Sequence, residues 1–200
     1  MATAEREDVV KLTELTIPGL YQVESPVWSD SRGYFREWYK EGDFAASGVD
    51  FSVQQGSLSM SKRGVIRGLH YSLAPEGQAK LVTCMSGELD DVIVDIRVGS
   101  PTYGQVEMIH LSSDEERSVL LPAGVAHGIC VMSELAVLSY LLSSPFNAPM
   151  EFEINPFDAE IKVPWALKCN AIVSEKDKAA PSLAQRLAAN ELPIYLTPHH

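Results

Sequence analysis

The sequence predicts an all-β fold, a jelly-roll barrel or a related closed double sheet with short peripheral helices. From about Ile17 to Tyr140 the chain consists of short β-branched and aromatic runs, separated by clusters of Gly, Pro, Ser and Asp. This rhythm is typical of an all-β sandwich or barrel. Closing many antiparallel strands into a double sheet also removes exposed strand edges.

The expected elements follow one another in a simple order. The first 16 residues are predicted to form an N-terminal arm or a short helix. Strands are predicted from β-branched and aromatic content at residues 65–73, 80–86, 91–98, 106–112, 118–123, 127–133 and 136–142. Gly, Pro and Asp in segments such as SGELDD and RVGSPTYG supply the tight turns between them. The spacing of Leu183, Leu187 and Leu192 predicts a helix within a C-terminal tail of residues 180–200.

The composition is that of a globular chain. Its 200 residues include 16 Lys and Arg against 27 Asp and Glu, which gives a formal net charge of −11, and 46% are hydrophobic. A chain of this length buries roughly 70% of the surface that its unfolded form exposes. No repeat or linker divides it, so residues 1–200 are expected to form a single domain. The negative charge disfavours nucleic-acid and membrane partners, because both need a basic surface.

The cysteines and the N-terminus indicate a cytoplasmic protein. Cys84, Cys130 and Cys169 lie far apart in sequence, and their odd number favours free thiols. The acidic N-terminus lacks the basic start and apolar run of a secretory signal. No window approaches the roughly 20 apolar residues of a membrane span.

Three polar residues interrupt the apolar strands. Strict alternation would place Arg67 and His70 on opposite faces of a sheet, because three residues separate them. A bulge or kink at Gly68 is required to bring both into one cavity. Taken alone, a His in a strand is more often a structural core residue than a catalyst. Lys80 opens an apolar strand, a position from which lysine usually extends to solvent.

The segment PAGVAHG, which places His127 just after a Pro-x-Gly turn, matches the PxGxxH half-motif of cupin barrels. Cupins commonly bind a metal through several histidines and a carboxylate. Here the other half is missing, because the upstream region holds only His70 and no HxH followed by Glu. Open catalytic sites usually keep three protein ligands. We therefore expect a cupin-like jelly-roll barrel without metal or other cofactor.

A metal-free cavity with His, Lys, Tyr and Arg suits proton transfer next to a carbonyl. An imidazole can remove a carbon-bound proton if a positive charge, such as that of Lys80, stabilises the enolate. A phenol such as Tyr140 can return a proton to the opposite face and invert the stereocentre. A carboxylate would orient the imidazole, although the spacing does not identify which Asp serves.

From about Gly19 to Leu183, the sequence resembles the dTDP-4-dehydrorhamnose 3,5-epimerase family. The matching segments, all in family order, are SRGYFREW, QQGSLSMSKRGVIRGLHY, DDVIVDIRVGSPTYG, LPAGVAHG and IVSEKDKAAPSL. The resemblance implies a cofactor-independent epimerase that inverts C3, C5 or both of a dTDP-4-keto-6-deoxyhexose. The products would serve rhamnose-type or antibiotic sugar biosynthesis.

The resemblance also implies roles for particular residues. His70 would be the base, Asp177 its dyad partner, Lys80 the stabiliser of the enolate oxygen, and Tyr140 the acid on the opposite face. The implied substrate contacts are Arg32, Glu37, Gln55, Ser57, Arg67, His127, Glu151 and Lys176. Arg32 and Glu37 would reach the nucleotide from the neighbouring subunit, which implies a homodimer.

Two departures from the family pattern bear on specificity. Many members have Asn where this chain has Ser57 in the sugar-binding segment, and Tyr where it has Phe146. The loss of an amide and a phenol near the sugar can change which carbon reaches the base. An epimerase of an antibiotic pathway that acts at C3 or C5 alone is therefore an alternative.

Other interpretations remain open at the level of sequence. Arg32 and Glu37 are also compatible with a surface ion pair. Tyr34 and Phe35 are as compatible with the core as with stacking on thymine. Asp177 and, more readily, Glu151 are also compatible with solvated loop charges. At the level of function, the alternatives are a metal-dependent cupin enzyme using His70 and His127 and a noncatalytic barrel that binds a sugar nucleotide.

Overall fold

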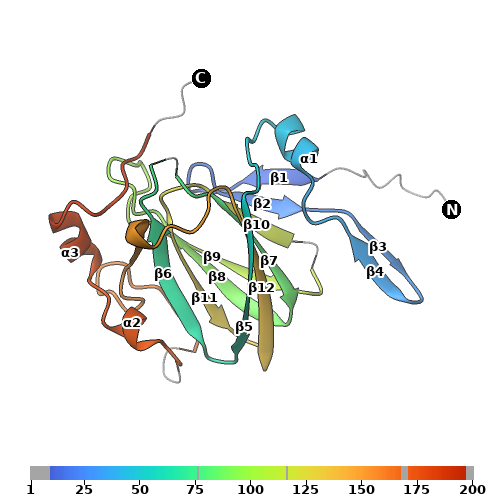
Figure 1. The fold of residues 1–200 in the computed structure, drawn as a ribbon. Helices are drawn as coiled ribbons and strands as arrows, with labels where there is room; N and C mark the ends of the chain where they lie inside the picture. Colours follow the sequence, from blue (N-terminus) through green and yellow to red (C-terminus); the bar gives the residue numbers. More distant parts are fainter. Residues whose placement is uncertain (1–9, 76, 116, 168–170, 197–200) are drawn as a thin grey trace.

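Two antiparallel sheets form the body of the protein (Figure 1). The computed structural model describes residues 10–75, 77–115, 117–167 and 171–196. The six-stranded sheet has the order β1 (Lys11–Glu14), β2 (Tyr21–Glu24), β10 (Arg117–Leu121), β7 (Lys80–Ser86), β12 (Leu135–Leu142) and β5 (Gln55–Lys62). The five-stranded sheet has the order β13 (Glu151–Glu153), β6 (Ile66–Ser72), β11 (Ala126–Val131), β8 (Glu88–Val94) and β9 (Val106–Ser112). Neighbours that are distant in sequence, such as β2 and β10, are typical of a jelly roll, and the all-β prediction is confirmed.

Apolar side chains from both sheets fill the space between them. Val82 of β7, Ile93 of β8 and Leu138 of β12 are at most 1% exposed and belong to one cluster. Alternation along β8 sends Val92 and Val94 to the opposite face, where a second cluster forms with the C-terminal segment. Strands such as β8 and β11 are therefore buried on both faces, which explains their nearly continuous apolar sequence.

Short helices cover the outside of the barrel. They are α1 (Glu41–Ala46), η1 (Ala148–Met150), α2 (Glu175–Lys178) and α3 (Leu183–Ala188). Phe44 of α1 packs on the six-stranded sheet in a third apolar cluster. The predicted C-terminal helix is confirmed as α3, which begins with a capping box between Ser182 and Gln185. Leu192 lies beyond its end, and Leu187 is 45% exposed.

The prediction of a helix or free arm at the N-terminus is wrong for residues 11–14. They form β1, which pairs with β2 in the register Leu12↔Val23. The pairing is favoured because Val10 and Ile17, which flank the strand, are buried at 3% and 0% exposure. Residues 1–9 lie outside the described part of the chain.

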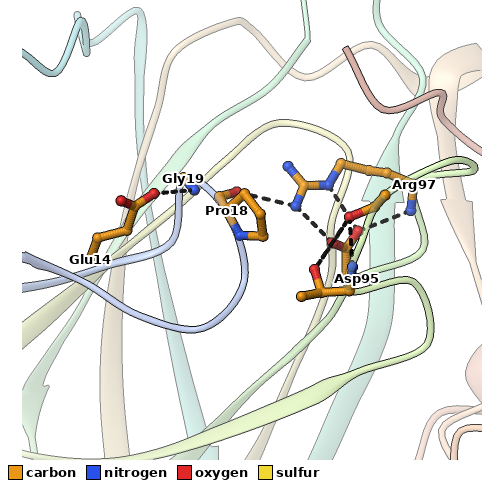
Figure 2. A network of polar contacts seen from close by, with 7 residues as sticks. Glu14, Pro18, Gly19, Asp95 and Arg97 are labelled. Atoms are coloured by element: carbon orange, nitrogen blue, oxygen red, sulfur yellow. Dashed lines mark hydrogen bonds and ion pairs between the residues drawn. The ribbon is translucent and has the colours of Figure 1, made fainter. Parts of the chain in front are cut away.

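A buried ion pair fastens the turn between β1 and β2 to the end of the five-stranded sheet (Figure 2). Arg97 Nη2 lies 2.8 Å from Asp95 Oδ2 and also donates to the Pro18 carbonyl at 3.1 Å. Gly19 N–H donates to Glu14 Oε1 at 3.0 Å on the other side of the turn. Burial raises the pKa of Asp95, but the hydrogen bonds from Arg97, Ser100 and Thr102 outweigh it and lower this pKa to about 2.

A two-stranded hairpin extends away from the barrel (Figure 1). It consists of β3 (Val27–Asp30) and β4 (Gly33–Arg36), with Trp28 opposite Phe35. Tyr34 and Phe35 are 59% and 62% exposed, so their interpretation as core residues is wrong.

No described helix is long and apolar enough to cross a membrane.

Candidate active site

A pocket of about 300 Å³ opens on the inner side of β5, β6, β7 and β12. It brings together seven of the predicted site residues: Gln55, Ser57, His70, Lys80, Tyr140, Glu151 and Lys176. Three residues that the sequence did not single out, Gln78, Leu142 and Phe152, complete the lining together with Phe146. Residues from five strands, two loops and a helix therefore converge on one cavity.

His70 and Asp177 form a hydrogen-bonded pair at the edge of this pocket. The distance between His70 Nε2 and Asp177 Oδ1 is 2.7 Å. The His70 side chain is 43% exposed and faces the cavity, whereas that of Asp177 is 6% exposed. Burial opposes ionisation of Asp177, but the hydrogen bond and charge of His70 hold the pKa of the carboxyl below its usual value. The interpretation of Asp177 as a solvated loop charge is therefore wrong.

The local structure of α2 presents Asp177 to the imidazole. Ser174 caps the helix, and its hydroxyl accepts a hydrogen bond from the Asp177 N–H at 3.0 Å. Upstream of the cap, Ile172 forms an isolated bridge with Val65, the residue just before β6. These contacts hold the C-terminal segment beside the strand that carries His70.

A break in the β6 register occurs where the sequence requires one. His70 lies opposite His127, but Arg67 lies opposite Ile129, so two residues of β6, Gly68 and Leu69, lie against the single residue Gly128 of β11. Gly68 has φ +118°, and a Cβ there would lie 2.6 Å from the Gly128 Cα. Only glycine fits this position.

Arg67 does not line the pocket despite this bulge. Its side chain is exposed, and Nε donates to Ser61 Oγ at 2.9 Å. Burial raises the pKa of Tyr140, and the positive charge of Arg67 acts in the opposite direction. The expectation that Arg67 and His70 share one cavity is therefore wrong, because only His70 lines the pocket and the Arg67 guanidinium binds Ser61.

Lys80 and Tyr140 lie across the pocket from the dyad, on neighbouring strands. Burial lowers the pKa of Lys80, while the carboxylates of Glu151 and Asp91 raise it in part. Burial raises the pKa of Tyr140, whose hydroxyl is 3.1 Å from Ser59 Oγ. The ammonium of Lys80 therefore faces the cavity and does not extend to bulk solvent.

Glu151 and Lys176 both have carboxylate or hydroxyl partners at the pocket edge. Glu151 Oε1 accepts a hydrogen bond from Ser72 Oγ at 3.1 Å, which fixes it beside the cavity. Lys176 Nζ forms an ion pair with Glu153 Oε2 at 2.9 Å and keeps a side chain that is 68% exposed. The interpretation of Glu151 as a freely solvated loop charge is therefore wrong.

His127 lies beneath the pocket and does not line it. Its Nε2 is 2.6 Å from Oδ1 of Asp91, and both side chains are almost completely buried. Its ring meets Tyr140 edge-on at a centroid distance of 6.1 Å. No group of three or more His, Cys, Asp or Glu in the described residues has the arrangement of a metal site.

Arg32 and Glu37 lie on or beside the β3–β4 hairpin, outside the pocket. Arg32 pairs with Asp30 of the same hairpin, not with Glu37. Both Arg32 and Glu37 are exposed. The interpretation of the two as an ion pair with each other is therefore wrong, and neither reaches the pocket of its own chain.

The family model described as dTDP-4-dehydrorhamnose 3,5-epimerase matches residues 14–185. The chain belongs to this family. The match spans both sheets, the pocket and the helix that carries Asp177. The resemblance drawn from the sequence motifs is thus confirmed.

Relatives within the family differ in the reaction named for them. The chain is 38% identical over 183 residues to a dTDP-4-dehydrorhamnose 3,5-epimerase of Mycolicibacterium smegmatis, a match that covers 91% of this chain and 90% of the relative. It is 40% identical over 189 residues to a dTDP-4-dehydrorhamnose 3-epimerase of Streptomyces niveus, with coverage of 94% and 91%. Similarity to the family therefore does not by itself separate single from double epimerisation.

Solved structures of the family have the same fold. NovW, a 4-keto-6-deoxy sugar epimerase from the novobiocin gene cluster of Streptomyces spheroides, superimposes with a TM-score of 0.90 at 38% identity and covers 98% of both chains. A dTDP-6-deoxy-D-glucose-3,5-epimerase of Legionella pneumophila, solved with dTDP-4-keto-L-rhamnose, gives a TM-score of 0.88 at 34% identity and covers 94% of this chain and all of its own. The jelly-roll prediction is confirmed by both.

Sequence reasoning on the family did not find Asp91, Gln78 or Phe152. Asp91 opens an apolar run, DVIVDIRV, in which a carboxylate among β-branched residues is itself an unusual feature. That feature was a detectable signal. Gln78 and Phe152 lie next to loops, and nothing in their local sequence distinguishes them from ordinary packing residues.

Proposed function

We propose that this protein epimerises a dTDP-4-keto-6-deoxyhexose at a carbon next to the C4 ketone. The observation that carries the proposal is the His70–Asp177 pair, which faces a pocket that also contains Lys80 and Tyr140. Such a site combines a base, a positive charge and a proton donor in one cavity, as inversion through an enolate requires. Membership of the epimerase family supports the same substrate class.

In the first step, His70 removes the carbon-bound proton. Because Nε2 is bound to Asp177, Nδ1 is the ring atom available to accept it. The electron pair of the broken C–H bond moves to form the enolate, with its negative charge on the C4 oxygen. Lys80 stabilises that oxygen, and the carboxylate of Asp177 offsets the charge of the imidazolium.

In the second step, Tyr140 donates its hydroxyl proton to the opposite face of the same carbon, and the ketone forms again. The stereocentre is inverted, and tyrosinate and imidazolium remain. Exchange with water returns both side chains to their starting forms. Solvent hydrogen therefore enters the product at each carbon that has been inverted.

The residues at the pocket mouth are proposed to bind the sugar and the diphosphate. Gln55 and Ser57 lie side by side, with Gln55 Nε2 donating to Ser57 Oγ at 3.1 Å. Gln55 Oε1 accepts from the backbone N–H of Phe146 at 2.8 Å, so the two positions that depart from the family pattern are linked through one amide. Lys176 supplies positive charge for phosphate oxygens, with Arg67 and His127 nearby in supporting positions.

We propose that the working form is a homodimer. The β3–β4 hairpin exposes Trp28, Tyr34 and Phe35 beside the cation of Arg32, a combination that suits a nucleotide base and its phosphates. Since this hairpin projects from its own barrel, it and Glu37 would complete the pocket of the neighbouring subunit. Cys84 and Cys130, both free and buried, support a reducing, cytoplasmic setting, while Cys169 lies outside the described residues.

The proposal is tested with dTDP-4-keto-6-deoxyglucose in deuterated water, with deuterium followed at each sugar carbon by NMR. We expect label at C3, at C5 or at both, and no label with His70→Ala at comparable dTDP affinity. Label at both carbons identifies a double epimerase, and label at one identifies a single epimerase. Binding of the substrate with no label at any carbon would overturn the proposal in favour of a noncatalytic barrel.

A further inference from the structure

The pocket lies above a second histidine–carboxylate pair that the proposed reaction does not use. Asp91 of β8 is 0% exposed, and His127 of β11 is 6% exposed. One carboxylate oxygen of Asp91 lies 2.6 Å from His127 Nε2. The other, Oδ2, is buried and has no hydrogen-bond partner within the described part of the chain. A buried carboxylate held by a single hydrogen bond is costly, so packing alone does not account for it.

The pair lies next to the reacting groups without lining the pocket. His127 is directly opposite His70 in the β6–β11 pairing, a position in which side chains are neighbours on one face. Its ring also meets Tyr140 edge-on at 6.1 Å. Asp91 therefore binds a residue, His127, that is a neighbour of both the proposed base His70 and the proposed acid Tyr140.

We propose that Asp91 is a positioning residue of the epimerase. Its carboxylate fixes the His127 ring against Tyr140 and supplies the interior negative charge that Lys80 and Tyr140 face. This inference rests on the proposed function, because it assigns a role in that reaction. Asp91 does not contact the substrate.

The electrostatics of the cavity agree with this role. Burial is the largest influence on both groups, and it lowers the pKa of Lys80 and raises that of Tyr140. The negative charge of Asp91 raises both pKa values, because it favours the ammonium and disfavours the tyrosinate. The reaction needs Lys80 charged and Tyr140 neutral, so Asp91 favours the working protonation state of each.

Other charged and titratable groups line this cavity or lie next to it. They are Arg67 and His70 from β6, His127 from β11, Glu151 from the start of β13 and Lys176 from α2. Of these, Glu151 raises the pKa of Lys80, as Asp91 does, and Arg67 lowers that of Tyr140. Asp91 alone acts in the same direction on the proposed acid and on the proposed enolate stabiliser.

The test is the pH profile of deuterium incorporation by Asp91→Asn, a substitution of nearly equal size. Loss of the charge lowers both pKa values, so the alkaline limit of activity is expected to move to lower pH by about one unit. At pH values above the wild-type limit, the rate of the variant relative to that of the wild type is then expected to be about tenfold lower than in the pH-independent range. The KM is expected to stay within about twofold, because Asp91 lies outside the pocket.

Asp90→Asn is the matched control. It removes the same charge from the next position of β8, where the side chain bonds His110 at 3.1 Å on the other face of the strand. Its pH profile is expected to match that of the wild type. A profile for Asp91→Asn that is uniformly reduced without a shift would mean a merely structural role and overturn the inference.

A second variant keeps the inference testable if Asp91→Asn does not fold. Asp91→Glu retains the charge, and its alkaline limit is expected to stay at the wild-type position even where kcat is reduced. A shifted limit in this variant would also overturn the inference. If the wild-type protein incorporates no deuterium, the proposed function itself fails, and the two failures are thereby distinguished.

Discussion

At the scale of single residues, proton removal by His70 and proton return by Tyr140 can be measured separately. Tyr140→Phe removes the proton donor but leaves His70 and Asp177 in place. Proton removal continues, and His70 returns solvent deuterium to the original face. We expect formation of the inverted sugar to fall by about 100-fold, with a much smaller loss of deuterium incorporation.

Both rates come from the same NMR time course, by comparing label at the carbon with its configuration. Tyr103→Phe is a suitable control, because Tyr103 is 38% exposed in the loop after β8 and does not line the pocket. Equal losses of exchange and inversion in Tyr140→Phe would contradict the role of Tyr140 as the acid.

The site residues differ in how far sequence could predict them. His70, Lys80 and Tyr140 lie on strongly patterned strands, and their convergence follows once the strands close into a barrel. The partner of His70 is 107 positions away on a four-residue helix, so no local spacing could identify it. Family motifs supplied Asp177, whereas Asp91 escaped because its role depends on a cross-strand neighbour.

At the scale of elements, the kink in β6 is the feature on which the site depends. A Cβ at Gly68 would lie 2.7 Å from the His127 carbonyl oxygen, and φ is +118°. We expect Gly68→Ala to lower the free energy of unfolding by about 3 kcal/mol, through backbone strain and overpacking. Urea denaturation measures the loss.

Gly42→Ala provides the comparison within the same chain. Gly42 lies in α1, and an added Cβ meets nothing within 4 Å. Alanine there is expected to be neutral or to stabilise by up to about 1 kcal/mol. If both substitutions left stability unchanged, the close approach of β6 and β11 at Gly68 would not be essential.

Elements were predictable where the hydrophobic pattern was strong. The ranges 80–86 and 106–112 agree with β7 and β9 to the residue, because turn segments bound them on both sides. β1 was mistaken for an arm or a helix, because four residues that pair at a sheet edge carry too short a pattern to reveal strand geometry. The β3–β4 hairpin was read only as a motif, since nothing local indicates that it projects from the barrel.

At the scale of the whole molecule, the proposed exchange of hairpins between subunits can be tested by mixing variants. Arg32→Ala lacks the hairpin cation, and His70→Ala lacks the base. If Arg32 serves the neighbouring pocket, each mixed dimer contains one site with both groups. Random reassembly of equal amounts then restores about a quarter of the wild-type sites.

The measurement is deuterium incorporation before and after the two inactive proteins are unfolded together and refolded. Refolding each protein separately controls for recovery of the fold. If Arg32 acts within its own chain, no dimer contains an intact site, so an inactive mixture would rule out the exchange.

The position of Asp177 has a consequence for how the protein is made. Among the described residues, the strands that form the barrel end at Glu153, and the segment after them both covers the second apolar cluster and delivers this carboxylate. A ribosome therefore completes every barrel strand before it supplies the dyad partner. The nascent chain therefore completes the His70–Asp177 pair last. A product truncated before α2 would have the strands of the enzyme without the carboxylate that orients His70.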